Sequence, residues 1–168
     1  MTETGESQAA DSSVPAERFF LVVVDASKEL RVALRFAAQR ARKTGGRVAL
    51  LSVLEPADFQ HWMAVEEKMR EERREEAERL LEKLGAEVTE ITGDMPSLYV
   101  REGKVSDEIL GLIKEEPNIS ILVLGAGTDK KGPGPLVSSL AGKLSGEFPV
   151  PITVVPGTLS DAQIDALT

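Results

Sequence analysis

Short apolar runs alternate with longer segments of mixed character along most of the chain. The runs are rich in Val, Leu and Ile, and they cover residues 19–24, 48–53, 98–100, 119–124 and 152–155. A continuous apolar run of this length is typical of a strand buried on both faces, as in a parallel sheet. The pattern therefore predicts five parallel strands.

The segments between the runs carry apolar residues at steps of three and four, which predicts helices. They cover residues 30–41, 58–92, 106–116 and 137–144. Ser27 and Ser106 are candidate N-caps, and Gly45 with Gly46 ends the first helix. Because strands and helices alternate, we predict an α/β fold. It is a Rossmann-like five-stranded parallel sheet with helices on both faces.

The segment at 58–92 permits two interpretations. A glycine inside a helix costs about 1 kcal/mol, so Gly85 could end the helix and leave residues 87–91 as a strand. We favour one long helix, because Gly93 and Pro96 supply a stronger stop signal.

The ends of the chain differ from its centre. Residues 1–16 are small and polar without apolar periodicity, so we predict that they are disordered. Residues 17–157 have the length of a single domain. Residues 158–168 form a tail with a short helix, in which Ser160 caps residues 161–167.

The net charge of the chain restricts the classes of molecule that it can be expected to bind. The formal net charge is -8, which argues against binding to nucleic acid and to anionic membranes. The first residues form no secretory signal or basic presequence, and no apolar run approaches the length needed to cross a bilayer. We therefore predict a cytoplasmic protein.

The residue types restrict the chemistry further. The chain has no cysteine and one histidine, His61, which excludes disulfides, thiolate nucleophiles and sites with several histidines. The neighbouring Trp62 is predicted to anchor an apolar helix stripe, and catalysis by His61 is less favoured. In a parallel sheet, ligands bind beyond the carboxyl ends of the strands. Three segments converge there: 25–27, 53–56 and 125–139.

Four motifs follow one another in a fixed order: VVVDAS, LLSVLEP, REGKVSDEIL and ILVLGAGT…VSSLAGKL…VPITVVP. Together they resemble the universal stress protein family over residues 19–157. The resemblance implies the adenine nucleotide alpha hydrolase-like fold and ATP, or a related adenine nucleotide, as ligand. It also implies that the family's adenosine-contacting aspartate corresponds to Asp25, and its adenine-contacting backbone to Val53.

Nucleotide-binding members carry a glycine, two residues, a glycine, nine residues and then Gly-Ser or Gly-Thr. In this chain those positions hold Gly125, Thr128, Ser138 and Ser139, and Gly127 stands one position early as a partial substitute. Glycines in such loops let backbone N–H groups approach phosphate oxygens. Thr128 and Ser138 stand where the motif has two of its glycines. Their side chains either crowd the phosphates or donate hydroxyl hydrogen bonds to them.

Each of these residues also has a purely structural interpretation. Asp25 can close the turn before the first helix, and Gly125 and Gly127 can supply a turn with positive φ. Ser138 and Ser139 can cap a helix. Lys130 and Lys131, in the Gly- and Pro-rich loop before these serines, are predicted to be solvated rather than phosphate-binding.

Three functions fit this sequence. The first is a nucleotide-binding stress or signalling module, and the second is a dimeric interaction protein of the same fold without ligand. A slow ATPase is the least favoured, because no base or arginine finger is recognisable. We expect a homodimer through the last strand, 152–155, which the resemblance implies lies at the sheet edge. In the alternative, the tail covers that edge and the protein is a monomer.

Overall fold

The computed structural model describes residues 17–56 and 63–168. The predictions for residues 1–16, His61 and Trp62 lie outside the described residues. Within the described part of the chain, no helix is long and apolar enough to cross a membrane.

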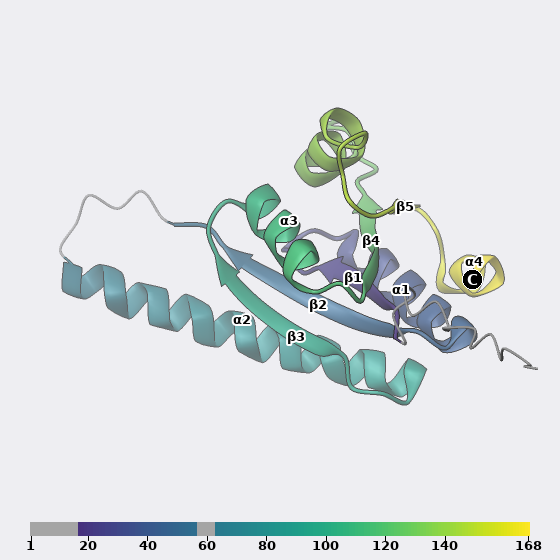
Figure 1. Cartoon of the computed structure of the whole chain (residues 1–168), viewed down its shortest axis with the longest axis horizontal. Helices are drawn as coiled ribbons and strands as arrows, with labels where there is room; N and C mark the ends of the chain where they lie inside the picture. The colour runs from purple at the N-terminus through teal and green to yellow at the C-terminus, as the bar shows by residue number, and fades with distance from the viewer. Residues whose placement is uncertain (1–16, 57–62) are drawn as a thin grey trace, which may run out of the picture.

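The five predicted strands are present in one parallel sheet. Its order is β3-β2-β1-β4-β5, and every neighbouring pair is parallel. The strands span Phe19–Val23 (β1), Arg47–Leu54 (β2), Ser97–Glu102 (β3), Ile119–Ala126 (β4) and Ile152–Pro156 (β5). This confirms the predicted α/β architecture and places β5 at an edge (Figure 1).

Helices cover both faces of the sheet, as predicted. They span Leu30–Thr44 (α1), Met63–Thr92 (α2), Val105–Glu115 (α3) and Asp161–Leu167 (α4), with a π-helix at Val137–Lys143 (η1). The central strand β1 shows why its sequence is apolar throughout. Phe20 and Val22 pack in the cluster with α1 and α2, whereas Leu21 and Val23 pack in the cluster with α3 and η1.

The helix α2 continues through Gly85, so the interpretation with a strand at 87–91 was wrong. A Cβ atom on Gly85 would lie 2.9 Å from Cε of Met95 and 3.5 Å from Cγ of Pro96. The glycine therefore lets the chain that enters β3 pack closely against the helix, which offsets its low helix propensity.

Two of the predicted N-caps were wrong. The N-cap position of α1 is Glu29 rather than Ser27, and that of α3 is Lys104 rather than Ser106; neither makes a side-chain capping bond. In the first case, the backbone N–H of Ser27 donates to Asp25 Oδ1 at 2.9 Å. That bond builds a separate turn, and α1 begins after it.

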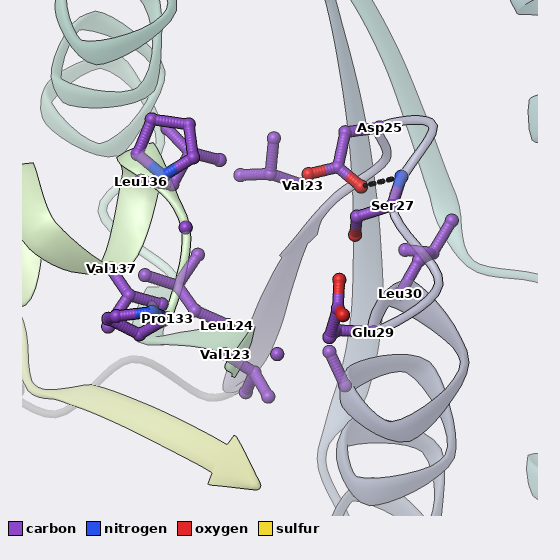
Figure 2. Close-up of a pocket in the computed structure, with 14 residues that line it drawn as sticks. Val23, Asp25, Ser27, Glu29, Leu30, Val123, Leu124, Pro133, Leu136 and Val137 are labelled. Atoms are coloured by element: carbon purple, nitrogen blue, oxygen red, sulfur yellow. Dashed lines mark hydrogen bonds between the residues drawn. The ribbon is translucent and has the colours of Figure 1, made fainter. Parts of the chain in front are cut away.

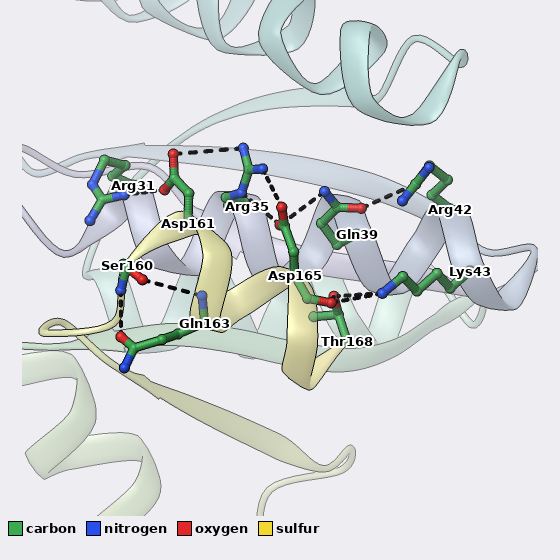
Figure 3. A network of polar contacts seen from close by, with 10 residues as sticks. All are labelled: Arg31, Arg35, Gln39, Arg42, Lys43, Ser160, Asp161, Gln163, Asp165 and Thr168. Carbon is green, nitrogen blue, oxygen red and sulfur yellow. Dashed lines mark hydrogen bonds and ion pairs between the residues drawn. The ribbon is translucent and has the colours of Figure 1, made fainter.

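The predicted helix in the tail is α4. Ser160 and Gln163 form a reciprocal capping box at its start, and Ile164 is fully buried in the cluster with α1. Asp165 accepts hydrogen bonds from Nε and Nη2 of Arg35 on α1, at 2.8 and 2.7 Å (Figure 3). This bond from Arg35 lowers the pKa of Asp165 below its ordinary value. Thus α4 is docked on α1.

Candidate functional site

The site lies at the point where the order of the strands in the sheet reverses, between β1 and β4. From β1 the chain adds β2 and β3 on one side, and then returns to add β4 on the other side of β1. In open α/β sheets, such a reversal leaves a crevice at the carboxyl ends of the two diverging strands, here β1 and β4. Two cavities open there, and they share Asp25 and Leu136 in their walls.

The larger cavity lies on the β2 side and has a volume of about 610 Å³. That volume falls in the range of small-molecule sites, roughly 300–1,000 Å³. Its walls come from the ends of β1 and β2, the start of α3 and the start of η1. They combine apolar groups such as Val24, Val53 and Leu136 with polar groups such as Asp25, Lys104 and Ser139.

The smaller cavity lies on the β4 side and has a volume of about 70 Å³. Its walls include Gly125 at the end of β4, Glu29 at the start of α1, and Pro133 in the loop before η1. Figure 2 shows the carboxyl groups of Asp25 and Glu29 on the same side of this space, across from Leu136 and Pro133.

Asp25 closes a turn and also borders the two cavities. One carboxylate oxygen accepts the Ser27 N–H and closes the turn before α1. The side chain is nevertheless exposed and borders both cavities (Figure 2). The structural interpretation of Asp25 is therefore correct, and it leaves the second oxygen facing the site.

Gly125 and Gly127 were expected to supply a turn with positive φ, and this interpretation is wrong. The glycines with positive φ are others, among them Gly132 and Gly134 in the following loop. Gly125 is required for close approach instead: a Cβ there would lie 2.3 Å from the backbone oxygen of Glu29. For Gly127, the Cβ would lie 2.9 Å from the backbone oxygen of Gly132.

The structure brings four of the predicted site residues together at the cavities. Val53, Ser139 and Asp25 line the larger one, and Gly125 lines the smaller one. Gly127, Thr128 and Ser138 lie beside this region but are not part of either wall.

The capping role predicted for Ser138 and Ser139 was also wrong. The helical segment starts ahead of both, where the Ser138 N–H donates to the oxygen of Gly134 at 3.0 Å. The π-helix η1 has no side-chain capping bond at its start.

Sequence reasoning missed three charged residues of the site. Glu29 lies four residues after Asp25, directly before α1. Lys104 lies in the REGK motif at the start of α3, and Arg73 reaches the larger cavity from α2. Nη1 of Arg73 donates to the backbone oxygen of Glu55 at 3.1 Å. The REGK motif could have pointed to Lys104, whereas no local signal marks Arg73.

The arrangement suits binding better than metal chemistry. In residues 17–56 and 63–168, no group of three or more acidic or histidine side chains could hold a metal ion. The larger cavity combines apolar side chains with the carboxylates of Asp25 and Glu55, the cationic groups of Arg73 and Lys104, and the hydroxyls of Ser106 and Ser139. Such a lining can stack a flat apolar ring and orient it through a few hydrogen bonds.

Comparison with known families identifies the family of the chain. The model of the Universal stress protein family matches residues 18–156. The chain belongs to the universal stress protein family. The match contains both cavities and ends before α4. No curated protein sequence matches the chain significantly.

Solved structures of universal stress proteins share the fold of this chain. The protein UspA from Lactobacillus plantarum has a TM-score of 0.68 and 20% identity, covering 84% of this chain and 99% of its own. A universal stress protein from Archaeoglobus fulgidus in complex with dAMP has a TM-score of 0.57 and 20% identity, covering 83% and 97%. Another, in complex with cAMP, has a TM-score of 0.57 and 14% identity, covering 86% and 100%. Some structural neighbours thus bind adenine nucleotides.

Proposed function

We propose that this universal stress protein binds an adenine nucleotide weakly at the carboxyl ends of β1, β2 and β4. The observation that carries the proposal is the larger cavity, which has the volume of a small-molecule site and is lined by both Asp25 and Val53. Relatives of the same fold in complex with dAMP and cAMP support an adenosine ligand of this class.

The lining supports a role for each group. Val53 lies next to the end of β2, where the backbone can pair with the edge of a purine, and Leu136 and Val24 provide apolar contacts for the ring. The free oxygen of Asp25 can accept a hydrogen bond from a ribose hydroxyl or an adenine amine. The proposal concerns binding, and turnover of ATP is not part of it.

Calorimetry with AMP tests the proposal. We expect Asp25→Ala to weaken AMP binding by about 1–3 kcal/mol, because a hydrogen bond to the ligand is lost. Asp129→Ala is the matched control: Asp129 accepts the N–H of Lys131 at 2.9 Å, the same turn geometry, but lines neither cavity. Equal AMP affinity in wild type and Asp25→Ala would remove Asp25 from the site.

The second candidate function is a dimeric interaction protein without a nucleotide. It is favoured by Thr128 and Ser138, which replace two glycines of the family's nucleotide motif. A mass measurement of small molecules released from natively purified protein separates the candidates. Release of an adenine nucleotide supports the binding function. If no nucleotide is released and the titration with AMP gives no heat of binding, the ligand-free alternative is supported.

We further propose a homodimer through β5 in a cytoplasmic protein. β5 is an edge strand, and Val154 on it is 37% exposed. An apolar edge strand pairs readily with another strand. The tail does not take this place, because α4 is docked on α1.

Light scattering tests the dimer. We expect Val154→Lys to shift the protein toward monomer, because it places an ammonium group in the contact. Val65→Lys is the control, since Val65 is also exposed, at 55%, but lies on α2. A wild-type protein that stays monomeric at high concentration would contradict the proposal.

A further inference from the structure

The side chain of Glu29 is packed against three glycines from two distant segments. Ideal Cβ atoms on these glycines would lie 2.7 Å from Glu29 Cβ (Gly125), 3.5 Å from Glu29 Oε1 (Gly127) and 2.9 Å from Glu29 Cγ (Gly157). A glutamate side chain therefore occupies the space that these glycines leave open.

The backbone holds this side chain in place. The oxygen of Glu29 lies against Gly125 and also accepts the N–H of Ala33 in the first turn of α1. Further along α1, Arg35 is paired with Asp165 of α4 (Figure 3). The start of α1 thus cannot move away from β4 without breaking packing at the sheet.

The carboxyl group of Glu29 makes the smaller cavity acidic. Glu29 and Asp25 stand on the same side of it (Figure 2), and the described residues of its wall include no Lys or Arg. Its volume is about 70 Å³, against about 610 Å³ for the larger cavity. The larger cavity, by contrast, is lined by two cationic side chains, Lys104 and Arg73, which balance the carboxylates of Asp25 and Glu55 in the same wall.

The carboxylates of the smaller cavity affect where the phosphates of a bound nucleotide can lie. In the family, the glycine motif that begins at Gly125 approaches the phosphates. Here a carboxylate stands at that turn, and a second carboxylate stands beside it. Like charges held close together at a partly buried site repel strongly, so the two carboxylates disfavour phosphates at this turn.

We infer that Glu29 is a specificity-determining residue that makes the site select adenosine or an adenosine monophosphate over ATP. This inference rests on the proposed adenine-ligand function. Base and ribose occupy the larger cavity, where a single phosphate has Lys104 and Arg73 within the same wall. Additional phosphates extend toward Glu29 and lower the affinity.

Calorimetry of the full chain with adenosine, AMP and ATP in Mg²⁺-free buffer tests the inference. For the wild type we expect ATP to bind at least about tenfold more weakly than AMP, a difference of about 1.4 kcal/mol. Glu29→Gln, which keeps the size and removes the charge, should recover about tenfold in ATP affinity and change adenosine affinity less than about twofold. Glu87→Gln, a carboxylate on α2 outside both cavities, is the control.

Glu29→Ala guards against a folding artefact, because it removes both charge and bulk and should raise ATP affinity at least as much as Glu29→Gln. If wild type binds ATP as tightly as AMP, or if neither variant changes the ratio of the two affinities, the inference is overturned while the proposed function stands. If none of the three ligands binds to wild type or to either variant, both are overturned.

Discussion

The two cavities at the carboxyl edge of the sheet lie side by side and share Asp25 and Leu136, but they differ in volume and in the charges of their walls. The larger one is lined by the cationic Lys104 and Arg73 as well as by the carboxylates of Asp25 and Glu55. The smaller one, with about a ninth of the volume, has the carboxylates of Asp25 and Glu29 and no Lys or Arg among the described residues of its wall. Both are products of the same strand order. The difference teaches that the fold provides a crevice, and that the start of α1 and the start of α3 decide which chemistry fits each part of it.

The largest expected effect concerns the packing that closes the smaller cavity. Gly125→Ala should lower the free energy of unfolding by about 3 kcal/mol, because its Cβ would lie 2.3 Å from the backbone oxygen of Glu29. Urea denaturation measures it. Gly142→Ala is the control, since a Cβ there meets nothing within 4 Å. Equal stability of Gly125→Ala and wild type would show that the start of α1 can shift away from β4 without loss of stability.

The next effect concerns the larger cavity. Ser106→Trp places an indole in its wall and should weaken adenosine binding at least about tenfold, because the ring overlaps the ligand. Asp107→Trp is the matched control, since Asp107 is the next residue of α3 and is exposed outside both cavities. Fluorescence or calorimetry measures the adenosine affinity of both variants. Equal adenosine affinity in the two variants would mean that the ligand binds elsewhere.

A smaller effect is expected at the replaced glycines. Thr128→Gly combined with Ser138→Gly should change ATP affinity less than about twofold, because neither side chain forms part of a cavity wall. If the pair instead strengthens ATP binding more than adenosine binding, these side chains crowd the phosphates, and Glu29 is not the main obstacle.

The sequence was sufficient to predict the fold because its signals are local. The apolar runs identified all five strands, and the Ser160 cap identified α4. The helix at 137–144 was also predicted, but not that it is a π-helix, because apolar periodicity does not encode the hydrogen-bond register of a short helix.

The candidate site was less predictable, since its decisive contact joins distant segments. Asp25, Val53 and Ser139 were identified through the resemblance. Glu29 was not, because its meaning depends on Gly125 and on a loop far along the chain. Even the role of Gly125 was misassigned, because a glycine needed for close approach looks the same in a sequence as one needed for positive φ.

The smallest effect concerns α4, which supports α1 beside the smaller cavity. The Arg35 hydrogen bond lowers the pKa of Asp165 from its ordinary value of 3.8. Between the lowered pKa and 3.8, the folded state therefore binds fewer protons than the unfolded state. The hydrogen bond stabilises the folded state fully above pH 3.8, and this stabilisation is lost as the pH falls through the lowered pKa. Asp165→Asn should be slightly less stable than wild type at pH 7, and the difference should vanish in acid.

Urea denaturation at several pH values measures this difference, and Asp94→Asn, at an exposed turn away from α4, is the control. A difference between wild type and Asp165→Asn that persists unchanged in acid would mean that the carboxylate charge does not hold α4.

The most direct test of the account is a titration of ¹⁵N-labelled protein with adenosine, followed by amide chemical shifts. The central claim is that the ligand occupies the larger cavity on the β2 side. It predicts the largest shift changes at the amides of Val53, Lys104 and Ser139, which line that cavity. The largest changes at Gly132 and Gly134, in the loop beside the smaller cavity, or no changes at saturating adenosine, would contradict it.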